Sequence, residues 1–270
     1  MLNAKNSSLK LSEGHMDYIS FGKGSEVLII LPGLGDGFIT VKGMALPLAL
    51  TYRNYAKRFK VYIFSRKSPL KDGYTTRDMA EDQAEAMKIL NITKANIMGI
   101  SQGGMIAQYL AIDYPQLLKI LILAVTLSKQ NETVKQVVSN WMEMAEAENY
   151  MDIVIDTSEK SYSENYLRKI RPFYPLLGRF KKPKDFNRFL VQANSCLNHN
   201  SHNELHRISC PTLIIGGGQD KILGSNSSFE IAKKVNNNEL FIYDNLGHGA
   251  YEEARDFNKR VINFLLKSKI

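Results

Sequence analysis

The chain has 270 residues, which fits one large α/β domain or one domain carrying an insertion. Its hydrophobic content of 44% is ordinary for a globular protein and supplies enough apolar side chains for a core. The formal net charge is +8, but the charge is spread over many segments and no DNA- or RNA-binding signature accompanies it, so we expect a solvated surface and no nucleic-acid partner.

The first expected elements are two antiparallel strands and one buried strand. Residues 9–11 and 16–21 alternate apolar and polar side chains around a Glu-Gly turn, which predicts an opening hairpin. Residues 27–31 form a continuous apolar run, typical of a strand buried on both faces of a sheet. The chain is therefore expected to begin with a mixed sheet.

A glycine-rich loop over residues 32–37 follows this strand. A dinucleotide fingerprint would need a third glycine where the chain has Phe38, and no Lys-Ser or Lys-Thr pair follows as a phosphate-binding loop requires. The loop therefore indicates neither a dinucleotide-binding fold nor a nucleotide triphosphatase.

Helix and strand patterns then alternate up to residue 125. The expected elements are a helix over 45–57, a strand over 61–64, a helix over 74–90 and a strand over 120–125. Thr75 or Thr76 can cap the second helix. Such alternation implies right-handed crossovers, so the fold class expected is α/β with a mostly parallel central sheet.

The regular alternation stops between residues 126 and 207. This long segment has a helical pattern, and a structureless loop of that length is improbable, so we expect an inserted helical lid. Continuation of the helical layers is the alternative. The domain organisation expected is thus a first core part (1–125), the lid (126–207) and a second core part (208–270), in which strands at 212–216 and 240–243 and two helices resume the alternation.

The stretch around Ser101 is the strongest motif in the chain. An apolar strand pattern over 96–100 runs into a Gly-x-Ser-x-Gly pentapeptide at 99–103, and a helix-period apolar pattern leaves it. Strand, sharp turn and helix are the context of a nucleophile elbow, in which glycines avoid collisions at the tight turn and the serine hydroxyl is exposed at a helix start. The alternative is a glycine-rich turn whose serine only caps the helix.

A serine nucleophile needs a base, and the base needs a carboxylate to orient it. Asp220 follows the expected strand 212–216, and His248, between two glycines, follows the strand 240–243. In an open parallel sheet, groups at the carboxyl ends of strands gather at one edge. We therefore predict that Ser101, Asp220 and His248 meet there, in that chain order.

Other residues compete for these roles. Asp244 lies only four residues before His248, and Asp113 lies on the helix beyond the elbow, where a surface position is expected. Four further histidines lie in the hairpin or the lid region and are expected to be solvated or packed. They are His15, His199, His202 and His206.

Through these motifs, the chain resembles serine-nucleophile members of the α/β-hydrolase fold superfamily over nearly its whole length. The resemblance implies Ser101 as nucleophile, Asp220 as acid and His248 as base, with the backbone N–H groups of Leu34 and Gln102 as the oxyanion hole. Many relatives carry His-Gly where this chain has Pro-Gly at 32–33, which leaves the amide at 34 available. Relatives often place Asp-x-Arg-Gly where this chain has Ser-Arg-Lys at 65–67, a departure to which we attach no catalytic consequence.

The expected function is hydrolysis of a small to medium carboxylic ester, thioester or lactone through an acyl-enzyme. The partner is thus a small-molecule acyl substrate, and neither a metal nor an organic cofactor is implied. A C–C bond hydrolase or lyase uses the same three residues, and a ligand-binding protein could keep the fold without useful turnover. Both remain open alternatives.

Location and surface charge complete the predictions. The N-terminus has no apolar stretch long enough for a signal peptide, and the longest apolar run, 117–127, is about half a membrane span. We expect a cytoplasmic protein without integral membrane association, with Cys196 and Cys210 as free thiols. A basic cluster in the lid either is a solvated face or steers an anionic substrate or a phospholipid surface. It comprises Arg168, Lys169, Arg171, Arg179, Lys181, Lys182, Lys184 and Arg188.

Overall fold

The computed structural model describes residues 2–177, 182–183 and 185–267. Its centre is an eight-stranded sheet in the order β1-β2-β4-β3-β5-β6-β7-β8. The strands β1 and β2 pair antiparallel, as do β2 and β4, and every later pairing is parallel. The strands are β1 (Lys5–Lys10), β2 (His15–Phe21), β3 (Glu26–Leu31), β4 (Phe59–Ser68), β5 (Ala95–Ile100), β6 (Leu118–Ala124), β7 (Thr212–Gly217) and β8 (Asn238–Tyr243).

Helices cover both faces of the sheet, because its central strands are apolar on both sides. In β3, Ile29 and Leu31 pack with α3, α4 and α10, whereas Leu28 and Ile30 pack with α1, α2 and α12 on the other face. These helices are α1 (Ala45–Thr51), α2 (Arg53–Ala56), α3 (Thr76–Ile89), α4 (Gln102–Asp113), α10 (Ser227–Ala232) and α12 (Phe257–Lys267). This arrangement confirms the expected α/β class and its opening antiparallel hairpin.

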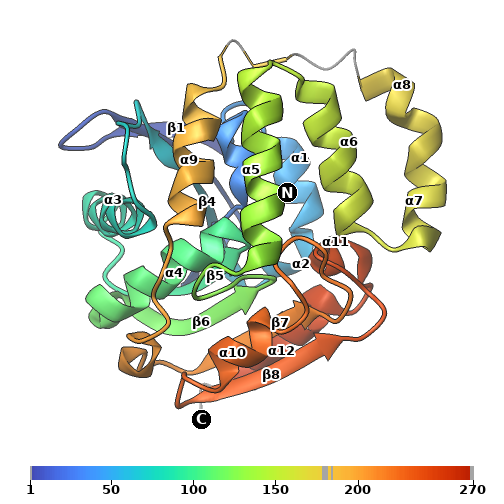
Figure 1. The fold of residues 1–270 in the computed structure, drawn as a ribbon. Coiled ribbons are helices and arrows are strands. Elements are labelled where there is room, and N and C mark those ends of the chain that lie inside the picture. Colours follow the sequence, from blue (N-terminus) through green and yellow to red (C-terminus); the bar gives the residue numbers. More distant parts are fainter. Residues whose placement is uncertain (1, 178–181, 184, 268–270) are drawn as a thin grey trace.

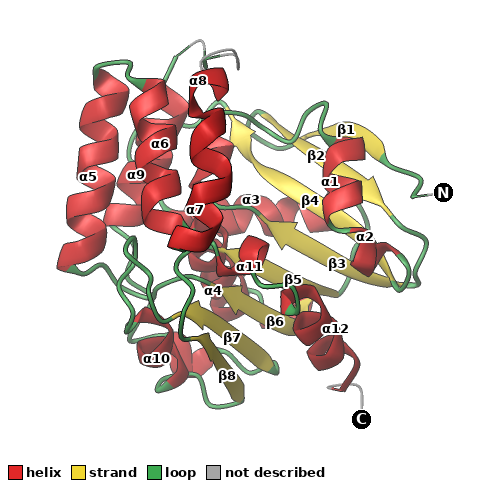
Figure 2. Ribbon diagram, turned by 90° about the vertical axis from the view of Figure 1, so that its right-hand side faces the viewer, coloured by secondary structure: helices red, strands yellow, loops and turns green. Residues whose placement is uncertain are grey.

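The segment between β6 and β7 is helical. It contains α5 (Glu132–Glu146), α6 (Tyr150–Ser161), α7 (Glu164–Ile170), α8 (Tyr174–Leu177) and α9 (Asn187–Leu197). The helices α5, α6, α7 and α9 gather at one end of the molecule, away from β7, β8 and α10 (Figures 1 and 2). Val138 and Trp141 on α5 pack with Phe189 on α9 in a separate hydrophobic cluster. Met105 of α4 also belongs to this cluster.

Most expected boundaries differ from the structure by one or two residues, and three elements differ by more. The strand expected over 61–64 spans residues 59–68. The opening strand starts at Lys5 rather than at residue 9, since its polar residues pair with β2 along the whole hairpin. The helix expected over 45–57 is broken into α1 and α2 at Tyr52, whose ψ of 21° leaves the α-helical range. Within the described ranges, no helix combines the length and the apolar character needed to cross a membrane.

Candidate active site

Ser101 occupies the sharp turn between β5 and α4. Its backbone has φ 54° and ψ −119°, a conformation that a non-glycine residue adopts only at a cost of order 1–3 kcal/mol. The turn is also tight, because a Cβ atom on Gly103 would lie 2.0 Å from the Leu31 carbonyl oxygen and one on Gly99 would lie 2.4 Å from that of Gly103. The two glycines of the pentapeptide are therefore steric requirements, as the motif predicted.

The structure brings the three predicted side chains together. The Ser101 hydroxyl lies 3.0 Å from His248 Nε2, and His248 Nδ1 lies 2.8 Å from Asp220 Oδ2. A carboxylate can only accept, so Nδ1 carries the proton that it donates to Asp220, and Nε2 is left to accept from Ser101. His248 and Asp220 are both buried, which shields this chain of hydrogen bonds from water.

Local structure holds both Asp220 and His248 in place. The second carboxylate oxygen of Asp220 accepts hydrogen bonds from the amides of Ile222 and Leu223, each at 2.8 Å, so the carboxylate cannot rotate freely. After His248, the amide of Gly249 donates to the Ser161 carbonyl at the end of α6, at 2.8 Å. A Cβ at position 249 would lie 2.5 Å from the Tyr162 ring, which explains the glycine that follows the histidine.

The two predicted oxyanion donors belong to two turns that approach each other at Ser101. Gln102 is the first residue of α4, and Leu34 is the first residue of the 3-10 helix η1 (Leu34–Gly37). Amides at the first position of a helix have no acceptor within that helix. A Cβ on Gly33 would lie 3.3 Å from Ser101 Cβ, so this loop runs directly beside the hydroxyl. The arrangement can stabilise a negative charge that develops next to Ser101.

A buried arginine, Arg66, links the loop that contains Leu34 to the start of α4 at Gln102. Its side chain at the end of β4 is 1% exposed, and its Nη2 donates both to the Pro32 carbonyl at 2.6 Å and to Gln102 Oε1 at 2.8 Å. The side-chain Nε2 of Gln102 in turn donates to the Gln192 carbonyl on α9 at 2.9 Å. Burial lowers the pKa of the Arg66 guanidinium to about 10, although the nearby Asp36 carboxylate favours the charged form.

A second arginine ties α9 to the same loop. Arg188 Nη2 lies 2.6 Å from Asp36 Oδ2, and the guanidinium also donates to the Asp36, Arg66 and Lys67 carbonyls. Asp36 Oδ2 additionally accepts from the Arg66 amide at 3.0 Å. Neither Arg66 nor Asp36 was expected from the sequence to have a role in the site. The signal that could have identified Arg66 is its place two residues after the expected apolar strand 61–64, because such a strand ends at the carboxyl edge of the sheet.

A cavity of about 440 Å³ opens at Ser101. Both Ser101 and His248 line it, and most of its wall is apolar, with contributions from Leu48 on α1 and from Val134 and Val138 on α5. Among the described residues, no lysine or arginine lines this cavity, whereas Asp36 and Glu252 do. The cavity suits an uncharged, largely apolar ligand.

The competing residues lie elsewhere. Asp244 is exposed, and Asp113 pairs with Arg77 at 2.7 Å. His199 is buried against Thr76, and His202 lies 2.9 Å from Ser128 Oγ. His15 on β2 and His206 on the 3-10 helix η4 (Leu205–Arg207) are exposed. In the described part of the chain, no group of three or more His, Cys, Asp or Glu could hold a metal ion, and Cys196 and Cys210 are free thiols.

Three members of the basic cluster in the segment 126–207 are paired locally. Arg171 pairs with Glu159 and Glu164 at 2.7 and 2.6 Å, and Lys182 pairs with Glu148 at 2.6 Å. Arg188 forms an ion pair with Asp36, as described above. Arg179, Lys181 and Lys184 lie outside the described residues. Pairing leaves Arg171, Lys182 and Arg188 little free charge with which to steer a ligand.

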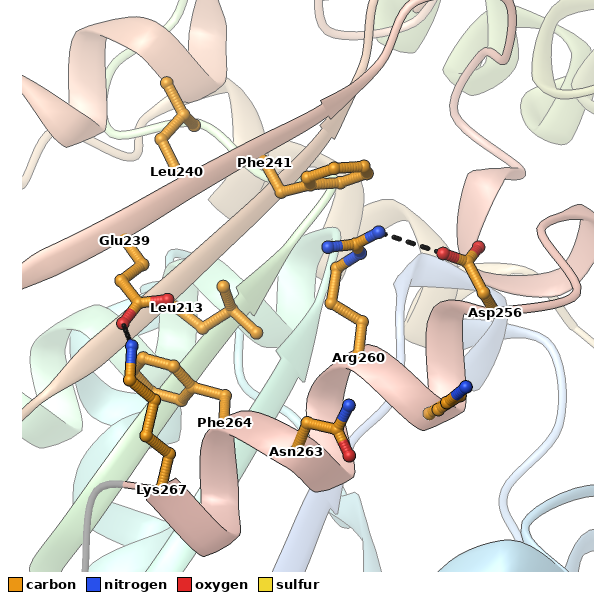
Figure 3. Close-up of a pocket in the computed structure, with 10 residues that line it drawn as sticks. Leu213, Glu239, Leu240, Phe241, Asp256, Arg260, Asn263, Phe264 and Lys267 are labelled. Carbon is orange, nitrogen blue, oxygen red and sulfur yellow. Dashed lines mark hydrogen bonds and ion pairs between the residues drawn. The ribbon is translucent and has the colours of Figure 1, made fainter. Parts of the chain in front are cut away.

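A second cavity, of about 370 Å³, lies at the free edge of the sheet between β8 and α12. Four of the five charged side chains that line it form pairs, as Figure 3 shows for Arg260 with Asp256 and for Lys267 with Glu239. The Arg260 guanidinium also stacks over Phe241, 3.4 Å from the ring centroid. Neither Ser101 nor His248 lines this cavity, so it has no part in the site at Ser101.

Several known proteins are similar in sequence. Monoacylglycerol lipase ABHD6 of Mus musculus is 27% identical over 188 residues, which cover 65% of this chain and 56% of that protein, so the match spans little more than half of its length. A 2-hydroxy-6-oxononadienedioate/2-hydroxy-6-oxononatrienedioate hydrolase of Pseudomonas sp is 23% identical over 278 residues, covering 91% of this chain and 90% of that protein.

Solved structures share the fold. An α/β hydrolase enzyme from a Medee basin deep-sea metagenome library superposes with a TM-score of 0.85 at 23% identity, over 98% of both chains. The enol-lactonase from Burkholderia xenovorans LB400 gives a TM-score of 0.79 at 19% identity, over 96% of this chain and 100% of that chain. The sequence model of the α/β hydrolase fold family matches residues 26–254. The chain therefore belongs to the α/β hydrolase fold family.

Proposed function

We propose that this protein is a serine hydrolase that cleaves a small to medium carboxylic ester, or a related thioester or lactone, through an acyl-enzyme on Ser101. The observation that carries the proposal is the continuous chain of hydrogen bonds from Asp220 through His248 to Ser101, at 2.8 and 3.0 Å. A hydroxyl placed on a strained turn, next to a base that is oriented by a carboxylate, is the arrangement that makes serine nucleophilic at neutral pH.

The reaction follows from this geometry. Ser101 Oγ attacks the substrate carbonyl carbon as its proton passes to His248 Nε2, and the amides of Leu34 and Gln102 donate to the oxyanion that forms. The tetrahedral intermediate collapses, and His248 gives the proton to the leaving alkoxide, which departs as the alcohol. A water molecule, deprotonated by His248, then attacks the acyl-enzyme carbonyl. Collapse of this second intermediate releases the carboxylic acid and returns the proton to Ser101.

The cavity supports a neutral ester as substrate. Its volume of about 440 Å³ is that of a small-molecule site, and its wall is mainly aliphatic and aromatic. With acidic Asp36 and Glu252 in the lining and no lysine or arginine among its described residues, an anionic acyl group would be placed without a cationic partner. Uncharged acyl chains of small to medium length are the better fit.

The helical segment 126–207 acts in this proposal as the expected lid. Val134 and Trp141 on α5, Thr157 on α6 and Cys196 on α9 all line the cavity. The segment therefore supplies part of the cavity wall, and a change in its position would change both the shape of the cavity and its access to water.

C–C bond hydrolysis is the second candidate, favoured by the match to the Pseudomonas hydrolase over 91% of this chain. The name of that relative describes a dicarboxylate substrate. The lack of a lysine or arginine among the described cavity residues argues against such a dianion here. We therefore rank it below ester hydrolysis.

A matched set of esters tests the proposal. The p-nitrophenyl esters of acetate, butyrate and octanoate are compared with the mono-p-nitrophenyl ester of succinate, which carries an additional carboxylate. We expect kcat/KM to favour the neutral esters, and Ser101→Ala to lower kcat by roughly 10⁶-fold. Equal turnover by wild type and Ser101→Ala would refute the serine mechanism, and a preference for the anionic ester would refute the charge assignment.

A further inference from the structure

The face of the molecule around α1 exposes large apolar side chains. Of the eight exposed large hydrophobic residues in the described part, four fall within residues 39–50. Their relative exposures are 67% for Ile39, 37% for Met44, 62% for Leu46 and 50% for Leu50. Single exposed residues of this kind are ordinary, but four within one short segment form an apolar patch of the kind that marks an interaction site.

Helix α1 has one side packed against the core and one side exposed to solvent. Ala45 and Ala49 pack into the core with the sheet, and Leu46 and Leu50, four residues apart, share the outward side. In Figure 2, α1 and α2 lie on the outside of the sheet near β1 and β4. No helix of the described segment 126–207 makes its main packing contacts with α1, which instead packs on β1, β2 and α2.

The segment that carries this patch is also strongly basic. Residues 37–60 contain five lysines and arginines and no acidic residue, although the whole chain has 27 of the latter. Lys42 precedes α1, and Arg53 and Lys57 follow it, all three of them exposed. In the described part of the chain, none of these three cations forms an ion pair, in contrast to the paired arginines of the lid segment.

A basic hollow lies at the end of this face. Lys23, Arg53 and Lys57 line it together with Asn54, and its volume is about 570 Å³. Three cations around one depression, without a carboxylate among the residues that line it, create a positive potential that attracts anionic groups. The hollow is large enough for a phosphate-bearing headgroup.

The face is continuous with the cavity at Ser101. Ile39 and Met44 belong to the exposed apolar patch and also line that cavity, together with Leu48 on the inward side of α1. A lipid surface in contact with this patch would therefore lie next to the opening through which an apolar ester reaches Ser101. No other exposed patch of the described residues has this continuity.

We propose that this face docks the protein onto an anionic phospholipid bilayer. Ile39, Met44, Leu46 and Leu50 enter the interface between headgroups and acyl chains, and Lys23, Lys42, Arg53 and Lys57 bind the headgroup phosphates. The physical basis is that of an interfacial helix, in which partial burial of an apolar side combines with attraction of flanking cations to negative lipid. Docking is reversible, and it brings uncharged lipid-borne esters to the cavity.

Vesicle binding tests this proposal without relying on turnover. The Ser101→Ala variant is used, so that binding is independent of the proposed hydrolysis and the lipid stays intact. It is mixed with vesicles of phosphatidylcholine alone, or of phosphatidylcholine with an equal amount of phosphatidylglycerol, and the bound fraction is measured by sedimentation. We expect preferential binding to the anionic vesicles, weakened by added salt because the charges are exposed.

Two double variants in this background identify the face. Arg53→Glu with Lys57→Glu should lower the partition coefficient by at least about 30-fold, since each cation near an anionic surface contributes roughly a fivefold gain. Leu46→Ser with Leu50→Ser should lower it by about 10-fold through lost apolar burial. Neither pair belongs to the site at Ser101, so circular dichroism and hydrolysis of a soluble ester by the corresponding variants with Ser101 restored check that the fold is intact.

A matched control lies on another side of the molecule. Phe229 on α10 is 42% exposed, and Lys233 and Lys234 follow it at the surface. Both views place α10 away from α1 (Figures 1 and 2). The variant Phe229→Ser with Lys233→Glu and Lys234→Glu removes one apolar side chain and reverses two charges there, and it should bind vesicles as the parent does.

Three results would overturn the proposal. The first is equal binding to neutral and anionic vesicles, or no binding to either. The second is loss of binding in the α10 variant as large as in the α1 variants. The third is unchanged vesicle binding after the leucine substitutions, together with loss of both vesicle and double-stranded DNA binding after the charge reversals, which would mark the face as a general polyanion site.

Discussion

Arg66 shows how one buried side chain can hold together two parts of the proposed active site. A single terminal nitrogen of its guanidinium holds the loop at Pro32 and the side chain of Gln102, so the two amides proposed for the oxyanion hole are coupled through it. Burial lowers its pKa to about 10, which still leaves it a cation at neutral pH. We infer that Arg66 is a positioning residue, since misplacing catalytic donors by about 1 Å can cost about 100-fold in rate.

Replacing Arg66 should therefore reduce kcat rather than substrate binding. For Arg66→Met we expect kcat to fall about 10- to 100-fold with little change in KM, and affinity for a boronic-acid transition-state analogue to fall in parallel. Arg66→Lys, which retains one donor, should lie between this variant and wild type. The control is Arg77→Met, which removes an arginine that pairs at the surface with Asp113 and Glu204.

Steady-state kinetics and thermal unfolding on the same preparations separate the outcomes. A folded Arg66→Met protein with wild-type kcat, or one whose KM rises while kcat stays constant, would contradict the positioning role.

Between elements, a buried polar network joins α3 and α4 to the chain that follows α9. His199 Nδ1 lies 2.9 Å from Thr76 Oγ1 on α3, and its Nε2 lies 3.2 Å from Ser201 Oγ, which donates to Gln108 Oε1 on α4 at 2.5 Å. Burial lowers the pKa of His199 to about 3. The imidazole is thus neutral in the folded protein, and the network fastens the helical segment 126–207 to the core.

This network should make stability depend on pH in a defined direction. Between about pH 6.5 and pH 3 the unfolded chain binds a proton at His199 that the folded chain does not, so its contribution to stability is full above pH 6.5 and is lost as the pH falls. The slope is at most roughly 1.4 kcal/mol per pH unit. Burial also raises the pKa of Asp82 to about 6, which opposes this effect below that pH.

Comparison with His199→Gln isolates the histidine, since Asp82 is present in both proteins. We expect the wild type to lose more of its free energy of unfolding than the variant between pH 7 and pH 4.5, measured by urea titration at each pH. Parallel curves for the two proteins would mean that His199 does not titrate between its folded and unfolded states.

Across the whole molecule, the sequence predicted what depends on local pattern and chain order. The alternation of apolar runs and helical periods predicted the sheet, and the glycines around Ser101 predicted the elbow. The order of Ser101, Asp220 and His248 at the ends of β5, β7 and β8 predicted their convergence, because parallel strands end at the same edge.

Contacts between distant segments could not be predicted in the same way. The links from Arg66 to Pro32 and from Arg188 to Asp36 join residues 34 and 152 positions apart, and no local period records them. The break of the helix at Tyr52 and the apolar outer side of α1 likewise depend on how the folded chain packs. The division into core and lid, and the cytoplasmic location, remain predictions.

The central claim is that His248 and Asp220 activate Ser101, and covalent labelling tests it most directly. A fluorophosphonate probe reacts with a serine whose proton is removed by a neighbouring base. We predict one adduct per chain, located at Ser101 by peptide mass spectrometry, with no adduct in Ser101→Ala and strongly slowed labelling in His248→Ala. Absence of labelling in the folded wild type, or an adduct that persists in Ser101→Ala, would contradict the account.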